Sequence, residues 1–138
     1  MAKASNTQTI QVLRDTVVEM VRRDSPDLSA RQLAVFLTCG LGSGDQTVRG
    51  LAATLNVSKP AITRALDRLE DLKLVRRAQD LQDRRSVLIN NTPKGIAHLR
   101  ELSKIMDAKA AEVQKQDTTA PRKVPVSYTH LRAHETSA

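Results

Sequence analysis

The 138-residue chain is poor in aromatic residues and cysteine, and each shortage excludes a class of protein. Phe36 and Tyr128 are the only Phe, Trp or Tyr residues, so the rings on which single-stranded nucleic acid is stacked are almost absent. Cys39 is the only cysteine, which excludes a disulfide scaffold. No apolar run approaches the ~20 residues that cross a bilayer, and the polar residues 1–11 lack a signal-peptide core. We therefore expect one cytoplasmic domain with an aliphatic core.

Positive charge is abundant, and it is concentrated in one part of the chain. The formal net charge is +7, from 22 Lys and Arg against 15 Asp and Glu. Residues 49–85 contain 9 basic and 5 acidic side chains, a net charge of +4. The net charge is 0 for residues 1–48, +1 for 86–117 and +2 for 118–138. A local excess of basic residues is typical of a nucleic-acid-binding surface.

The spacing of apolar residues predicts a mainly α-helical fold with a small β-hairpin. Helices are expected at residues 7–23, from residue 30 to Gly40, Gly42 and Gly44, and at 50–55, 59–72 and 93–116. Their predicted N-caps are Ser29 (with Gln32 in the capping-box position), Ser58 and Thr92. Residues 74–78 and 86–90 are expected to pair as strands around a long polar tip, and residues 46–48 to form a short strand. The last helix is longer than a small core needs, which predicts that its far end packs on another chain.

The cluster from Gly40 to Gly44 invites comparison with a phosphate-binding loop. It lacks the Gly-Lys-Ser/Thr ending and does not follow a strand, so we interpret it as a helix stop and a turn.

The helices predicted at 50–55 and 59–72 have the spacing of a helix-turn-helix. The second helix of such a pair can enter the major groove of duplex DNA with its N-terminal side chains at base edges. The predicted DNA contacts on this helix are Ser58, Lys59, Pro60, Thr63, Arg64 and Arg68. Arg64 suits bidentate pairing with guanine, and Thr63 or Pro60 suits contact with a thymine methyl group.

The tip of the hairpin supplies a second group of predicted DNA contacts. Arg84 and Arg85 suit the DNA backbone or a narrow minor groove, where the negative potential favours arginine. Asp83 lies beside them and can accept a hydrogen bond that orients Arg85.

Two segments resemble those of MarR-type winged-helix regulators. Residues 51–70, LAATLNVSKPAITRALDRLE, resemble the helix-turn-helix, and residues 80–89, DLQDRRSVLI, followed by Thr-Pro-Lys-Gly at 92–95, resemble the wing and the start of the next helix. The resemblance covers residues 29–106. It implies a winged helix-turn-helix in a bacterial or archaeal transcription regulator that binds duplex DNA as a homodimer. It also implies Arg85, oriented by Asp83, at the minor groove, and a small aromatic or anionic effector that no residue here identifies.

The sequence departs from the family pattern at two places. Where the family has a further C-terminal helix that assists dimerisation, this sequence continues into the segment 118–138. Asn91 stands where the family commonly has an apolar residue before the threonine. We expect residues 1–28 and 93–117 to dimerise, residues 29–92 to form the DNA-binding domain, and residues 118–138 to be disordered. The composition of this last segment resembles a translated vector sequence, and a native disordered terminus is the alternative.

The main alternative function is a winged helix that binds proteins without sequence-specific DNA binding. His98 is the only histidine before residue 118, and no ligand partner is evident in the sequence, so we expect no metal, no cofactor and no enzyme activity. Cys39 follows an apolar helix without a basic neighbour in sequence, which favours a buried inert thiol over a redox sensor.

Overall fold

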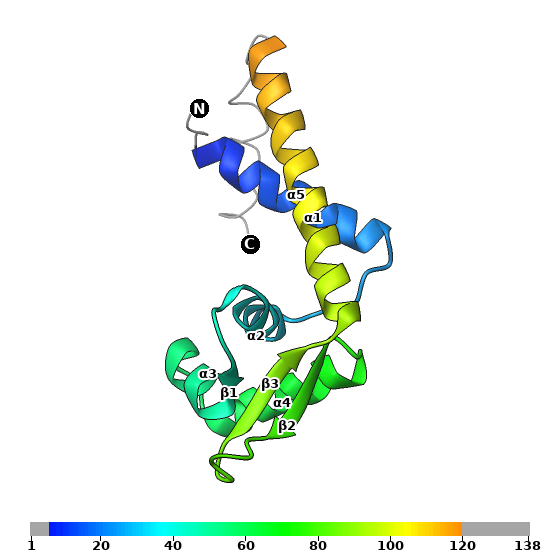
Figure 1. Cartoon of the computed structure of the whole chain (residues 1–138). Helices are drawn as coiled ribbons and strands as arrows, with labels where there is room; N and C mark the ends of the chain where they lie inside the picture. Colours follow the sequence, from blue (N-terminus) through cyan, green and yellow to red (C-terminus); the bar gives the residue numbers. More distant parts are fainter. Residues whose placement is uncertain (1–5, 120–138) are drawn as a thin grey trace, which may run out of the picture.

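The computed structural model describes residues 6–119, which form helices and a small antiparallel sheet. The elements follow in the order α1 (Asn6–Arg22), α2 (Ala30–Leu41), β1 (Gln46–Thr47), α3 (Val48–Leu55), α4 (Lys59–Asp71), β2 (Val75–Gln79), β3 (Val87–Asn91) and α5 (Pro93–Thr119). Helices α2, α3 and α4 pack with the sheet, and the long α5 extends away from them with α1 across it (Figure 1). The predicted mainly α-helical winged helix is confirmed.

The hydrophobic core is aliphatic around a single ring and lies between α2, α3, α4 and the sheet. Phe36, Leu51, Ile62, Leu66 and Leu69 are each 0% exposed. The last three lie at steps of four and three residues along α4, so they form an apolar stripe that faces the core. Burial of this stripe leaves the opposite side of α4 in solvent.

The predicted N-caps are all present, because each depends on residues close together in the chain. Ser29 and Gln32 form a capping box, with hydrogen bonds of 3.1 and 2.9 Å. Ser58 Oγ accepts a hydrogen bond of 3.2 Å from the Ala61 N–H, and Thr92 Oγ1 accepts one of 2.9 Å from the Gly95 N–H. These caps fix where α2, α4 and α5 begin.

The predicted end of the second helix is confirmed at Gly42, and the prediction is wrong for Gly40. Gly40 was expected to help end the second helix, but it lies inside α2, which continues to Leu41 and has Gly42 as its C-cap. A Cβ atom at Gly40 would overlap the side chain of Leu99 on α5. The glycine therefore permits the close approach of two helices.

The sheet has the strand order β1-β3-β2, and both pairs of strands are antiparallel. Strands β2 and β3 form the predicted hairpin one residue later than expected, with Arg77 opposite Ile89. The short β1 adds a third strand, with Gln46 opposite Ile89. Thr47 then caps α3, which makes that helix begin at Val48.

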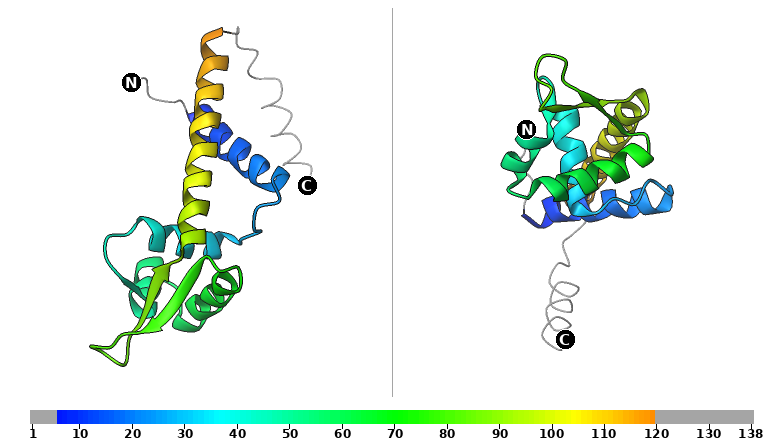
Figure 2. Two further views of the ribbon diagram at one scale, coloured as in Figure 1. Left: turned by 45° about the vertical axis from the view of Figure 1, so that its right-hand side comes forward. Right: turned by 90° about the horizontal axis from the view of Figure 1, so that it is seen from below.

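Helices α1 and α5 pack together beyond the core of the winged helix (Figure 2). Leu102, Ile105 and Val113 of α5 are buried, and Gln11 Nε2 donates to Gln116 Oε1 at 3.3 Å. The far end of α5 thus contacts α1 of the same chain, and its packing on another chain stays a prediction. Helix α5 also extends two residues past the predicted boundary at 117, while residues 120–138 of the predicted tail lie outside the described residues.

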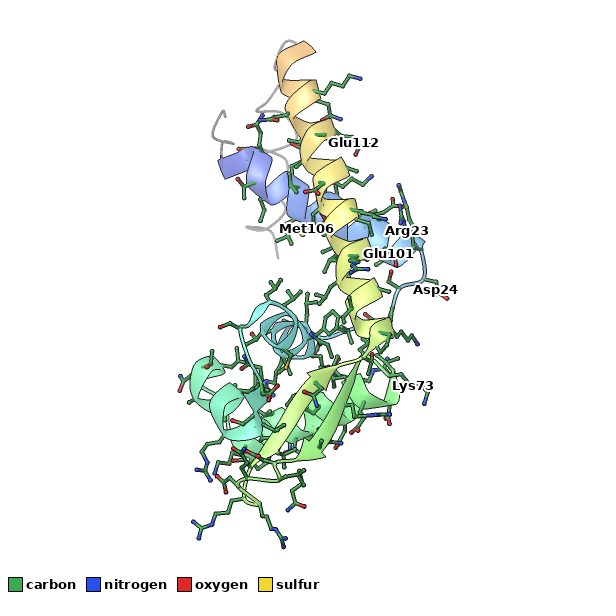
Figure 3. All side chains as sticks on the ribbon, in the orientation of Figure 1. Arg23, Asp24, Lys73, Glu101, Met106 and Glu112 are labelled. Carbon is green, nitrogen blue, oxygen red and sulfur yellow. The ribbon has the colours of Figure 1, made fainter. Side chains whose placement is uncertain are left out.

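The turn between α4 and β2 is held against the start of α5. Thr92 Oγ1 donates a hydrogen bond of 2.6 Å to the carbonyl oxygen of Lys73, the labelled residue of this turn in Figure 3. A Cβ atom at Gly95 would overlap the carbonyl oxygen of Leu74. In the Thr-Pro-Lys-Gly segment, the threonine therefore caps α5, and the glycine lets α5 lie close to the backbone of Leu74.

Gly95→Ala should lower the free energy of unfolding by about 1–3 kcal/mol, because the added methyl group forces the helix and the turn apart. Urea unfolding followed by circular dichroism measures the change. Lys94→Ala, at the exposed neighbouring position, is the control and should remain within about 0.5 kcal/mol of the parent chain. Equal stability of Gly95→Ala and the parent chain would contradict the close approach.

Candidate nucleic-acid interface

A tight turn between α3 and α4 directs the start of α4 into solvent. Asn56 has φ 55° and ψ 46°, the left-handed conformation that asparagine tolerates. The N–H of Val57 donates to the carbonyl oxygen of Ala52 at 3.1 Å, and Ser58 then caps the new helix. This is the geometry of a helix-turn-helix, with α4 in the position of its second helix.

The structure places every predicted contact residue of α4 on its exposed side. The N-cap Ser58 and the helix residues Lys59, Pro60, Thr63, Arg64 and Arg68 are all exposed. The oxygen of Ser58 accepts the capping hydrogen bond, which leaves its O–H group as the donor for a ligand. Lys59, Arg64 and Arg68 therefore place three cations on the exposed side of α4, opposite its buried stripe.

The wing, residues 80–86 between β2 and β3, is held by its own aspartates. Asp80 Oδ1 accepts from the N–H of Gln82 at 2.9 Å, and Asp83 Oδ1 accepts from the N–H of Arg85 at 3.1 Å. Asp83 Oδ2 also accepts from Ser86 Oγ at 3.2 Å. These turns shape the wing without apolar packing.

Asp83 accepts a hydrogen bond from Arg85, as the sequence predicts, but the donor is the main-chain N–H. The carboxylate thus fixes the backbone of Arg85, while its side chain and that of Arg84 are exposed. Gln79 Nε2 donates to the carbonyl oxygen of Arg84 at 3.0 Å, which holds this side of the wing to β2. Both arginines therefore extend from a shaped loop.

Arg77 joins the base of the wing to α4, and the sequence prediction missed it. Its Nη2 atom lies 2.7 Å from Asp67 Oδ1 and 2.7 Å from Glu70 Oε1, and its Nε donates to Glu70 Oε1 at 2.8 Å. The hydrogen bond from Arg77 lowers the pKa of Glu70. The alternation of side chains along a strand could have indicated this position, since it places Arg77 on the inner face of β2 together with the buried Val75.

A second surface is apolar and lies on α1. Ile10, Leu13, Val17, Val18 and Val21 are 60%, 53%, 47%, 39% and 75% exposed, and we call them the α1 apolar face. Ile10, Leu13, Val17 and Val21 recur at steps of three and four residues, which is the spacing of one helix face. A contiguous apolar face of this kind is typical of a protein–protein interface.

The other side of α1 packs on α5 with polar and charged groups. Gln8 and Thr16 are buried there, and Arg23 Nη1 lies 3.3 Å from Glu101 Oε1 (Figure 3). The Arg23 hydrogen bond also lowers the pKa of Glu19, which lies 3.8 Å from Lys109 Nζ. Contact with α5 therefore leaves the apolar face of α1 uncovered.

Cys39 and His98 lie where α2 meets α5 and the sheet. Burial raises the pKa of the Cys39 thiol to about 11, so the thiol is protonated at neutral pH, in agreement with an inert cysteine. The ring of His98 lies 5.6 Å from that of Phe36. Within residues 6–119, no group of three or more His, Cys, Asp or Glu residues is arranged to hold a metal ion, and no helix is long and apolar enough to cross a membrane.

Comparison with solved structures gives the same fold. The S. aureus MepR–DNA complex is 21% identical, with a TM-score of 0.65 over 80% of this chain and 87% of MepR. RV1404 of Mycobacterium tuberculosis is 19% identical, with a TM-score of 0.66 over 98% and 95% of the two chains. Transcriptional regulator Tm0710 of Thermotoga maritima is 18% identical, with a TM-score of 0.60 over 94% and 87%. No curated protein sequence gives a significant match.

The family comparison covers the segment that contains the helix-turn-helix and the wing. The model of the MarR family matches residues 28–87, from the residue before the cap of α2 to the first residue of β3. Over this segment the chain is similar to the MarR family.

Proposed function

We propose that this chain is a transcriptional regulator that binds duplex DNA sequence-specifically. The observation that carries the proposal is the position of an exposed, cationic α4 and a basic wing in one segment with a net charge of +4. The match of residues 28–87 to the MarR family model and a similar structure solved with DNA support it. Protein–DNA interfaces are far more positively charged than protein–protein interfaces, which speaks against a winged helix that binds only proteins.

The two DNA-binding elements have different roles in this proposal. Helix α4 enters the major groove, where Arg64 pairs with guanine, Thr63 and Pro60 touch base edges, and Lys59 and Arg68 bind phosphates. The wing lies along the adjacent minor groove, with Arg84 and Arg85 as its cations. Asp83 acts on the DNA contact indirectly, through the backbone position of Arg85.

The regulator acts as a homodimer, with residues 1–28 and 93–117 as the proposed dimerisation region. The support is the α1 apolar face, which a second copy of the chain can cover around a two-fold axis. Two copies of α4 then read the two halves of a palindromic site. The regulator responds to a small-molecule effector whose identity is not part of the proposal. The proposal includes neither a cofactor nor an enzyme activity. It places the chain in the cytoplasm, where the DNA of a bacterium or archaeon lies.

The dependence of binding on salt tests the proposal against the protein-interaction alternative. Fluorescence anisotropy with a labelled duplex library should detect binding at low salt. The affinity should fall roughly 10³- to 10⁵-fold between 50 and 200 mM salt if 6–10 phosphates are neutralised. Absence of binding at low salt would refute DNA binding, and a salt-independent affinity would refute the phosphate contacts.

A further inference from the structure

Arg77 occupies the junction between the two proposed DNA-binding elements. It lies at the centre of β2, directly opposite the buried Ile89 of β3. Its side chain is 26% exposed and binds carboxylates on two successive turns of α4, those of Asp67 and Glu70. The N–H of Arg77 also donates to Glu70 Oε2 at 3.4 Å. One residue of the wing strand therefore holds α4 through both its side chain and its backbone.

The position of these carboxylates matters for a DNA-binding helix. Asp67 follows Arg64 by three residues and Thr63 by four, so it lies on the same face of α4 as the proposed base contacts. Its side chain is 56% exposed, and that of Glu70 is 37% exposed. Two ionised carboxylates on this side of the helix repel DNA phosphates unless a cation neutralises them. Arg77 is the cation that the structure places between them.

The geometry of the contact also restricts the angle between the wing and α4. The planar guanidinium group donates in fixed directions, and charge-assisted hydrogen bonds are stronger than neutral ones. Strand β2 leads directly into the wing at residue 80, so the position of the wing depends on where β2 sits on α4.

We propose that Arg77 is a positioning residue for DNA binding, which neutralises Asp67 and Glu70 and holds the wing in register with α4. This inference rests on the proposed function. Arg77 acts through these two carboxylates, so it differs from Arg64, Arg84 and Arg85, which are proposed to contact DNA themselves.

Removal of Arg77 and of its partners distinguishes this role from a direct contact. Arg77→Gln leaves two uncompensated carboxylates, and we expect about 10- to 100-fold weaker binding to a preferred duplex. The triple variant Arg77→Gln/Asp67→Asn/Glu70→Gln removes the repulsion but does not restore the contact that holds the wing, so its affinity should lie between those of Arg77→Gln and the parent chain. Arg76→Gln is the matched control, since Arg76 is the exposed neighbour on β2 and its loss changes the net charge equally.

The free energy of unfolding and the affinity for DNA are measured on the same variants. If Arg77 were only a structural residue, Arg77→Gln would lower the stability, and the triple variant would not regain affinity. If Arg77→Gln does not fold, Arg77→Lys keeps the charge without the forked contact and should show a smaller loss of affinity. The inference is wrong if folded Arg77→Gln binds as tightly as Arg76→Gln, or if the triple variant stays as weak as Arg77→Gln. Failure of the parent chain to bind any duplex would instead remove the proposed function, and the inference with it.

Discussion

Replacement of Leu13 and Val17 together by glutamate should dissociate the homodimer and weaken binding to a palindromic site about 10²- to 10⁴-fold, because the two half-sites are no longer linked. Both side chains lie within the α1 apolar face and are about half exposed, so the charges should not disturb the core. In the dimer the same charges would be buried and unpaired, which is strongly unfavourable. Light scattering measures the oligomeric state, and fluorescence anisotropy measures the affinity.

Leu41→Glu is the control for this double substitution. Leu41 is an exposed leucine at the end of α2, 78% exposed and outside the α1 apolar face. Its substitution should leave both the dimer and the affinity unchanged. A double variant that remains dimeric, or a parent chain that is monomeric at all concentrations, would contradict the role of α1.

Arg64→Ala should cost about 1–3 kcal/mol of binding free energy at each half-site, because a bidentate contact to guanine is lost. A symmetric dimer loses the contact twice, so the effect on a palindromic site is roughly doubled. Preference at one base position per half-site should relax. Arg64 is exposed, so thermal unfolding should be almost unchanged.

Arg68→Ala is the comparison one turn further along α4. As a proposed phosphate contact, its loss should weaken all sequences equally and reduce the salt dependence. Equal losses on all sequences for Arg64→Ala would make Arg64 a phosphate contact and contradict its assignment to a base.

The features predicted correctly from the sequence are those that neighbouring residues determine. A cap needs a side-chain oxygen and an N–H three residues later, as at Ser29, Ser58 and Thr92. The left-handed turn at Asn56 is equally local. The exposed side of α4 followed from the apolar stripe on its other side. These local rules placed all the predicted contacts of α4 on one surface.

The features that were missed depend on residues far apart in the chain. Gly40 lies within α2, where its missing side chain leaves room for Leu99 of α5, a contact over 59 residues that the local pattern does not contain. Asn91, the departure from the family pattern, donates from Nδ2 to the carbonyl oxygen of Cys39 at 3.3 Å. It thus joins β3 to the last turn of α2, which explains a polar residue at this position.

The charge pattern gave the location of the proposed interface but not its internal pairing. Of the nine basic residues in 49–85, Arg77 is engaged with α4 and contributes little free charge to DNA. The sequence spacing of ten residues between Arg77 and Asp67 carries no periodic signal, because one lies on a strand and the other on a helix. Similarly, the spacing on α1 predicted an apolar face but not that α5 would pack on the other side.

Selection of binding sites from random duplex DNA, with the whole chain at low salt, tests the central proposal most directly. The account predicts enrichment of an inverted repeat whose half-site centres are about 10–10.5 base pairs apart, or a multiple of this distance. An enriched site of this kind would establish both sequence-specific binding and two-fold symmetry. Recovery of no enriched sequence from repeated rounds would contradict a sequence-specific regulator.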